Sequence, residues 1–243
     1  LHAIVFSKRT WSSRNTWDSP QMSSGWSELQ GRGRLVSGLQ SYSEEKYWGE
    51  KKKTSTPRKT GGEVSEKHIS VQDNKIYFYS GVNRNACVEL NKKIGELESK
   101  SLTLSKTLGI LPPSIKVFIN SGGGSIVSGI ASMDTILRSK VPVHTYVDGF
   151  SASAATFLTV VGTKRYMSRN SYMLVHQLST QFWGTYSNFE DEKQNLDLMM
   201  KNIKNIYKEY TKIPMKKLNE ILKHDLFWDA NTCLEYGMID EII

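Results

Sequence analysis

Residues 115–138 read IKVFINSGGGSIVSGIASMDTILR, which is an apolar strand followed by three glycines and a helix. Ile115–Ile119 predicts a buried strand, and the glycines after it predict a tight turn. In the helix, expected at about 125–138, apolar residues recur with the 3.6-residue period of a buried face. They are Ile126, Ile130, Met133, Ile136 and Leu137. This strand–turn–helix unit sets the fold class expected for the rest of the chain.

Strands and helices alternate on both sides of this unit. Further strands are predicted at Lys75–Tyr79, Val141–Val147, Lys164–Met167 and Tyr172–His176. Further helices are predicted at 85–99, Ser153–Val161 and 188–211, with a short helix and a final strand in Leu234–Ile243. This alternation indicates an α/β fold with largely parallel strands.

The predicted helix at 188–211 carries one apolar stripe opposite many charged residues. The stripe consists of Phe189, Leu196, Met199, Ile203, Ile206 and Tyr210. At 1.5 Å per residue the helix would span about 36 Å, which is long for a small domain. We therefore expect it to protrude and to mediate oligomerisation. The alternative is a helix that covers its own sheet.

The basic charge of the chain is concentrated near its N-terminus. Residues 1–62 hold 11 Lys and Arg against 5 Asp and Glu, a net charge of +6 out of +8 for all 243 residues. We expect residues 1–67 to be a basic extension rich in Ser, Gly and Trp, poorly ordered or similar to a propeptide. Residues 68–243 are expected to form the folded domain. Basic and aromatic residues together can also contact single-stranded nucleic acid, but we do not expect a nucleic acid partner.

Composition also restricts the cellular context. No run of 18 apolar residues occurs, so the sequence predicts no membrane span. Cys87 and Cys233 form neither a metal-binding pattern nor a disulfide framework. We expect two reduced thiols in a protein of the cytoplasm, of an organelle matrix or stroma, or of a virus-infected cell. No metal and no organic cofactor is called for.

Two small-residue segments point to acyl transfer. The glycines of Asn120–Ser125 let backbone N–H groups approach developing negative charge at a helix N-terminus. No Gly-Lys-Ser/Thr follows them, so a nucleotide-binding P-loop is not supported. In Gly149–Ala155, Ser153 is expected in the first turn of a helix, with Ala154 positioned to donate its N–H to an oxyanion. Ser151 is a competing nucleophile, but the nucleophile elbow that it would need requires a glycine at position 153.

Serine becomes a strong nucleophile only when a neighbouring base takes its proton. His176 follows the predicted strand Tyr-Met-Leu-Val and is the best candidate base, whereas His144 lies inside a strand and is expected to be structural. A carboxylate usually orients such an imidazole. Asp225 is the candidate and is expected to be partly buried. Three alternatives stay open from the residues alone, namely Asp148, Asp229 and Asp240.

Residues from about 75 to 243 resemble ClpP, the proteolytic subunit of the Clp protease. That family carries an Asn-Ser-Pro-Gly-Gly loop, a Gly-x-Ala-Ala-Ser segment, a His-Gln pair, an Asp-x-Phe segment and a Glu-Tyr-Gly-Leu-Ile/Val-Asp ending, in this order. The matching segments here are Asn120–Gly124, Gly149–Ser153, His176-Gln177, Asp225–Phe227 and Glu235–Asp240. Five matches in order, at separations similar to those of the family, make the resemblance specific.

The resemblance implies a role for each matching residue. Ser153 would be the nucleophile, His176 the general base and Asp225 the group that orients it. The backbone N–H groups of Gly124 and Ala154 would form the oxyanion hole.

The resemblance also implies a fold and an assembly. We expect the ClpP/crotonase-type spiral of β-β-α units, with a protruding handle helix at about 178–211. Seven-membered rings, alone or stacked in pairs, would enclose the active sites, and a separate AAA+ unfoldase would use ATP to feed unfolded chains into the chamber.

Five positions depart from the family pattern. The family's Pro in the glycine loop is Gly122 here, its Ala is Ser151, and its Pro after His-Gln is Leu178. An Arg that the family uses between rings is His224, and an aromatic residue of the unfoldase docking surface is Lys116. The chain therefore resembles divergent members of the family, such as those of phages, large viruses or organelles.

The expected function is that of a serine endopeptidase that cleaves unfolded polypeptides or peptides inside an oligomeric chamber. One alternative is a non-catalytic subunit of a mixed ring, although inactive relatives usually lack members of the triad. The other is a crotonase-like acyl-CoA enzyme, which shares the oxyanion hole but does not need Ser, His and Asp at these places.

Overall fold

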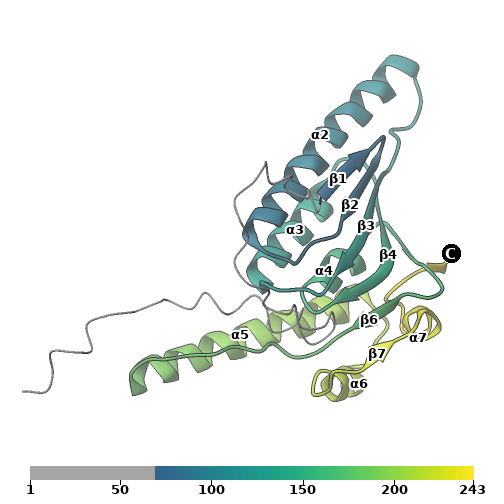
Figure 1. The fold of residues 1–243 in the computed structure, drawn as a ribbon. Coiled ribbons are helices and arrows are strands. Elements are labelled where there is room, and N and C mark those ends of the chain that lie inside the picture. Colours follow the sequence, from purple (N-terminus) through teal and green to yellow (C-terminus); the bar gives the residue numbers. More distant parts are fainter. Residues whose placement is uncertain (1–68) are drawn as a thin grey trace, which may run out of the picture. The chain divides into compact units, whose positions relative to one another are not determined.

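A computed structural model describes residues 69–243 (Figure 1). The extension expected at residues 1–67 lies outside this range. The described strands are β1 Ile69–Gln72, β2 Lys75–Phe78, β3 Ile115–Ser121, β4 Val143–Ala152, β5 Lys164–Met167, β6 Tyr172–Leu174, β7 Phe227–Trp228 and β8 Glu241–Ile242. The described helices are α2 Arg84–Leu108, α3 Ile126–Arg138, α4 Ala155–Val160, α5 Tyr186–Tyr210, α6 Met215–Ile221 and α7 Ala230–Glu235.

The strands form one eight-stranded sheet in the order β1-β2-β3-β4-β5-β8. All neighbouring pairs from β2 to β8 on this path are parallel, and β1 joins β2 as an antiparallel hairpin. The strand β6 pairs in parallel with the second half of β4, and β7 pairs with β6 in the antiparallel direction. The predicted α/β class with largely parallel strands is confirmed.

The unit β3–α3 forms as its sequence predicts. Alternate residues of β3 are buried, from Ile115 through Val117 and Ile119 to Ser121, so one face of the strand points into the core. The Ser125 hydroxyl then accepts a hydrogen bond from the N–H of Ser128 at 3.3 Å and caps α3. Such a cap satisfies one of the free N–H groups at the start of a helix.

The other face of the sheet carries a row of stacked aromatic rings. Tyr77, Phe118, Tyr146 and Tyr166 stand at neighbouring register positions of β2 to β5. Their successive ring centroids are 5.0, 4.5 and 4.7 Å apart. Cross-strand aromatic pairs stabilise a sheet by roughly 0.2–1 kcal/mol each. The row therefore helps to fix the register of four parallel strands.

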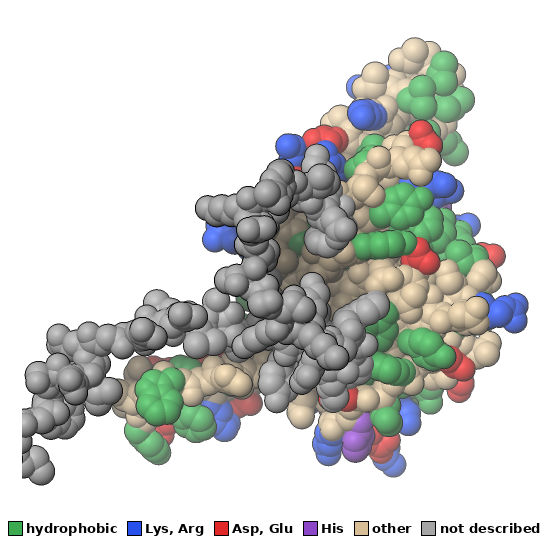
Figure 2. All heavy atoms as spheres, viewed as in Figure 1, with side chains coloured by type: hydrophobic (Ala, Val, Ile, Leu, Met, Phe, Trp, Pro, Cys, Tyr) green, Lys and Arg blue, Asp and Glu red, His purple; other side chains and the backbone are tan. Residues whose placement is uncertain are grey.

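Two elements are longer than their sequence patterns predicted. The helix α2, expected at 85–99, continues to Leu108 and ends at Gly109, whose φ of 66° is the left-handed conformation of a helix C-cap. The strand expected at Val141–Val147 continues to Ala152 because its last residues pair with both β3 and β6. Figure 2 shows hydrophobic side chains gathered at the far end of α2 and at the far end of α5.

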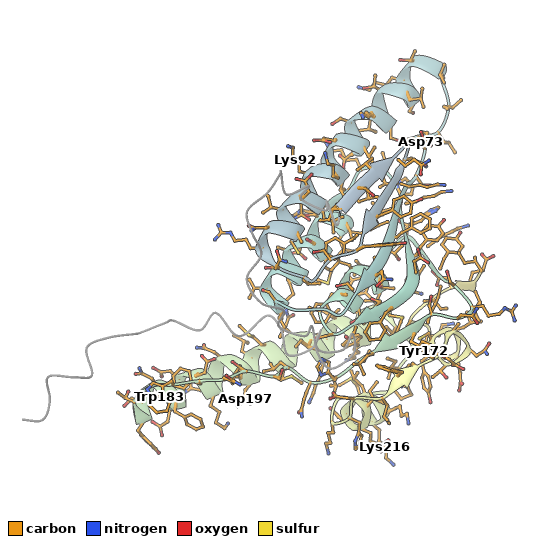
Figure 3. All side chains as sticks on the ribbon, viewed as in Figure 1. Asp73, Lys92, Tyr172, Trp183, Asp197 and Lys216 are labelled. Carbon is orange, nitrogen blue, oxygen red and sulfur yellow. The ribbon has the colours of Figure 1, made fainter. Side chains whose placement is uncertain are left out.

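The long helix α5 spans Tyr186–Tyr210, within two residues of the helix predicted at 188–211, and it begins after the handle start expected at about residue 178. Its apolar stripe divides into two parts. Ile203 and Ile206 are buried in the core of the domain, whereas Phe189 is 57% exposed. Trp183 and Asp197 mark how far the segment extends from the sheet in Figure 3. The C-terminal half of α5 thus covers its own domain, and the N-terminal half presents apolar side chains to the outside.

Arg165 on β5 fastens the C-terminal end of α5 to the last strand. Its Nη1 donates to the carbonyls of Tyr210 at 2.6 Å and Gly237 at 2.8 Å. Its Nε and Nη2 form a fork with the two carboxylate oxygens of Asp240, with 3.0 Å from Nε to Oδ2. Partial burial by itself raises the pKa of Asp240, but the hydrogen bonds and charge of Arg165 outweigh it, so this pKa lies below its usual value.

We expect Asp240→Asn to destabilise the domain at pH 7 by about 1 kcal/mol, because the arginine fork loses its charged acceptor. A carboxylate with a lowered pKa stabilises the fold above its unfolded pKa and loses this effect as pH falls through the folded pKa. The difference between wild type and variant should therefore shrink on acidification below about pH 4. Urea unfolding at several pH values measures it.

The matched control is Asp197→Asn, which removes an exposed helix ion pair with Lys193 in which both side chains are more than 60% exposed. It should change the free energy of unfolding by less than about 0.5 kcal/mol. Equal losses for the two variants, or a difference for Asp240→Asn that does not depend on pH, would contradict the role given to the fork.

Candidate active site

Ser153 occupies a strained turn between β4 and α4. Its φ is 54°, one of two positive values among the non-glycine residues of the described chain. The sequence placed it in the first turn of a helix, which is wrong, because β4 continues to Ala152 and α4 begins only at Ala155. A non-glycine residue in this conformation costs about 1–3 kcal/mol and is often found at active sites.

Hydrogen bonds hold both sides of the Ser153 peptide. Its N–H donates to the carbonyl of Leu174 in β6 at 2.9 Å. Its carbonyl accepts from the N–H of Thr156 at 3.0 Å and from the Thr156 hydroxyl at 2.6 Å. The turn is therefore fixed to the sheet on one side and to the first turn of α4 on the other.

The glycine loop after β3 lies against this turn. Gly123 has φ 91°, and a Cβ built on it would lie 2.6 Å from the Cβ of Ser153 and 3.1 Å from the nitrogen of Ala154. Gly124 has φ 139°, and a Cβ there would lie 2.4 Å from the carbonyl oxygen of Val82. Both positions require glycine for conformation and for space. The two loops of small residues predicted from the sequence thus meet at Ser153.

Two backbone N–H groups beside Ser153 are left without a protein acceptor in residues 69–243. Val82 forms hydrogen bonds with the residues on both sides of Gly124. Its N–H donates to the carbonyl of Gly123, and its carbonyl accepts from the N–H of Ser125, both at 2.7 Å. Neither the N–H of Gly124 nor that of Ala154 donates to a described acceptor. A pair of unpaired donors next to a serine is the arrangement that stabilises a tetrahedral oxyanion.

His176 and Asp225 lie together at the end of β6. The Nδ1 of His176 is 3.2 Å from Oδ1 of Asp225, with side chains 22% and 46% exposed respectively. The Asp225 side chain is therefore partly covered. A carboxylate at Nδ1 favours the tautomer that carries its proton there, and in that tautomer Nε2 has the lone pair that a general base needs.

Pairing in the sheet brings these two residues together across almost 50 positions of sequence. Leu174, which accepts from the N–H of Ser153, precedes His176 by two residues and pairs with Phe227 in β7. The N–H of Gln177 donates to the carbonyl of Leu222 at 2.7 Å, just before Asp225. One short strand thus positions the serine turn, the histidine and the carboxylate.

The three alternative carboxylates are engaged elsewhere. Asp148 accepts a hydrogen bond from the hydroxyl of Tyr79. Asp229 accepts from a backbone N–H in the first turn of α7 and caps that helix. Asp240 belongs to the fork with Arg165. The alternatives left open by the sequence therefore contact other partners.

The competing serine and histidine also have structural positions. Ser151 is fully buried, and its hydroxyl lies 2.9 Å from that of Thr159. His144 stands in β4 between Lys116 and Lys164 in the register of the sheet. Burial and then the charges of Lys164 and Lys116 lower the pKa of His144. This favours a neutral ring, as expected for a structural residue.

The part of the chain that the structure describes contains no group of three His, Cys, Asp or Glu side chains placed to hold a metal ion. No described helix is both long and apolar enough to cross a membrane. Burial raises the pKa of the Cys233 thiol to about 12, and Cys87 is buried as well.

The described chain thus combines a parallel α/β sheet with a serine turn, a glycine loop and a His–Asp pair. Residues 71–243 match the Clp protease family, and the chain belongs to this family. It is 37% identical over 131 residues to the ATP-dependent Clp protease proteolytic subunit 1 of Chlamydia felis. The aligned region covers 53% of this chain and 64% of that protein. Subunit 3 of Streptomyces coelicolor is 34% identical over 131 residues, which is 60% of its length.

Among solved structures, a ClpP1 mutant from Listeria monocytogenes has the same fold. The two superimpose with a TM-score of 0.61 at 24% sequence identity, over 70% of this chain and 91% of that one. The expected fold class is confirmed by this match. The sequence match to each of the two curated relatives spans less than two thirds of that relative.

We expect Gly124→Ala to destabilise the domain by at least about 2 kcal/mol, because the added Cβ would meet the Val82 carbonyl in a backbone conformation that disfavours it. Gly95→Ala is the control. Gly95 lies in α2 with open space around it, so alanine there should stabilise by about 0.5–1 kcal/mol. Urea unfolding compares them, and equal midpoints would show that the Gly124–Val82 contact is not required.

Proposed function

We propose that this chain is a serine endopeptidase of the ClpP type. Ser153 is the nucleophile, His176 its general base and Asp225 the carboxylate that orients the base. The N–H groups of Gly124 and Ala154 form the oxyanion hole. The observation that carries the proposal is the strained Ser153 turn, held next to two unpaired N–H donors and beside the strand that leads to the His–Asp pair.

The proposed reaction has two halves. His176 Nε2 takes the proton of Ser153 as its Oγ attacks the peptide carbonyl, and the N–H donors of the oxyanion hole receive the negative oxygen. The imidazolium then gives its proton to the leaving amine, which leaves an acyl-enzyme. A water molecule, deprotonated by the same histidine, then attacks the acyl carbon. The bond from this carbon to Ser153 Oγ breaks, the imidazolium returns its proton to Oγ, and the acid product leaves. Asp225 keeps the imidazole in the required tautomer throughout.

The substrates that we propose are unfolded polypeptides or peptides, cleaved within an oligomer of this chain. A protruding helix with exposed apolar residues supports self-association, since large exposed apolar patches usually mark contact surfaces. Rings of seven subunits, single or stacked, would form the chamber. The chain's own residues supply the chemistry, and ATP would be used by a partner unfoldase.

We expect Ser153→Ala to abolish both peptide hydrolysis and labelling by a fluorophosphonate, because the variant has no oxygen to attack. Intact mass spectrometry of wild-type protein should show one covalent adduct, and the variant should show none. Ser151→Ala is the control and should keep its adduct, since Ser151 is buried against Thr159.

Wild-type protein that assembles but takes up no adduct would favour the non-catalytic ring subunit. An adduct that persists in Ser153→Ala would contradict the assignment of the nucleophile. Saturable binding of acyl-CoA in the absence of any adduct would favour the crotonase-like alternative.

We expect Phe189→Asp with Leu198→Asp to yield smaller species in sedimentation velocity, because these exposed α5 side chains are 57% and 67% accessible. Charged groups there would oppose burial against another subunit. Lys193→Ala with Lys201→Ala, on the same helix, is the control and should leave the sedimentation coefficient unchanged. An unchanged coefficient for the aspartate pair would contradict a role of α5 in assembly.

A further inference from the structure

A buried tyrosine on α5 contacts the helix that follows the serine turn. Tyr207 is 1% exposed, and its ring lies beside that of Phe157 with centroids 6.0 Å apart. Its hydroxyl oxygen is 2.5 Å from Oγ1 of Thr156, which is 51 residues away in sequence. Burial is the larger influence on the Tyr207 hydroxyl and raises its pKa, so the group stays protonated.

The direction of the hydrogen bonds follows from the number of protons. The Thr156 hydroxyl has one proton, and its bond to the Ser153 carbonyl uses it, because a carbonyl oxygen can only accept. The Tyr207 hydroxyl must therefore donate to Oγ1 of Thr156. A directed chain of hydrogen bonds thus runs from Tyr207 through Thr156 to the carbonyl of Ser153. Each donor in such a chain polarises the next one and strengthens its bond.

This chain of hydrogen bonds ends at Ser153, the residue with the least favourable backbone conformation in the site. Ser153 has φ 54°, which only contacts from the surrounding structure can maintain. Its carbonyl orientation sets the ψ of Ser153 and, with it, the direction of the Ala154 N–H across the same peptide plane. Whatever fixes this carbonyl also fixes one donor of the proposed oxyanion hole.

We propose that Tyr207 is a positioning residue for the Ser153 turn, which it holds through the Thr156 hydroxyl. This inference rests on the proposed function for its effect on rate, but its effect on the turn does not depend on catalysis. Tyr207 does not contact the reacting atoms. It makes the C-terminal half of α5, which covers the domain, part of the support of the nucleophile.

Three variants distinguish a role of Tyr207 in positioning the Ser153 turn from a role that only gives a buried hydroxyl a hydrogen-bond partner. Tyr207→Phe keeps the ring and removes the donor, Thr156→Ser keeps the hydroxyl, and Thr156→Val keeps the shape but removes both hydrogen bonds. With a fluorogenic peptide, Tyr207→Phe should lower kcat about 3- to 10-fold at unchanged KM, the effect of one hydrogen bond. Thr156→Val should lower it further, and Thr156→Ser should restore the wild-type rate.

The double variant Tyr207→Phe/Thr156→Val gives the sharpest distinction. Thr156→Val alone leaves the buried tyrosine hydroxyl without a partner, which lowers the thermal midpoint, and removal of both partners should restore that midpoint. Under the positioning role, kcat stays low in the double variant although stability recovers. Recovery of kcat together with stability would overturn the proposal.

Tyr210→Phe is the matched control, because it makes the same change one turn of α5 away, where the side chain is only partly buried. It should leave kcat unchanged. A loss equal to that of Tyr207→Phe would overturn the proposal, since it would show a general response of α5 to loss of a hydroxyl.

Amide hydrogen exchange tests the same inference without any catalytic activity. The N–H groups of Ser153 and Thr156 bond to the Leu174 and Ser153 carbonyls in the native turn. In Tyr207→Phe they should exchange about 3- to 10-fold faster than in wild type, and in Tyr210→Phe they should not. Unchanged exchange in Tyr207→Phe would overturn the positioning role, even if the chain hydrolysed no peptide. Absence of fluorophosphonate labelling in wild type, with faster exchange in Tyr207→Phe, would reject only the proposed function.

Discussion

The close approach of two backbones, at Gly123 and at Ser153, is the contact on which the rest of the site depends. A Cβ on Gly123 would lie 2.6 Å from that of Ser153. The glycine loop can reach the serine only because β3 and β4 are parallel neighbours whose carboxyl ends meet at one edge of the sheet. Parallel α/β sheets bind ligands at this edge because the loops there converge. The site is therefore a consequence of sheet topology before it is a matter of side chains.

The same topology explains why the histidine and the carboxylate belong to short elements. The strand β4 is long enough to pair with β5 through its first half and with β6 through its second half. The strand β6 then anchors the Ser153 turn and, through β7, draws Asp225 toward His176. From the other side α5 packs on α4, where the Tyr207 hydroxyl meets Thr156. Elements that are distant in sequence thus stabilise one strained turn.

The sequence predicted best what local pattern controls. The apolar pattern in Ile115–Ile119 and the 3.6-residue period after it predicted the bounds of β3 and α3 within one or two residues. The separate prediction of a strand at Lys164–Met167 gave the observed bounds of β5. Prediction failed where tertiary contacts decide. Gly149 interrupts the apolar pattern, yet β4 continues past it because both neighbouring strands pair there.

The residues of the candidate site could be proposed from the sequence, but their geometry could not. Asp225 could not be separated from its alternatives by sequence spacing, because pairing of β6 with β7 brings it to His176. The left-handed conformation of Ser153 had no local signal, since serine does not favour it. The role inferred for Tyr207 had no local sequence signal either, because its position in the apolar period of α5 is that of an ordinary core residue.

The most direct test of the central claim is a crystal structure of the protein after reaction with a fluorophosphonate. Phosphorus bonded to Oγ of Ser153 is predicted, with the phosphoryl oxygen within hydrogen-bonding distance of the N–H groups of Gly124 and Ala154. An adduct on another residue, or a phosphoryl oxygen that points away from both N–H groups, would contradict the arrangement of nucleophile and oxyanion hole described above.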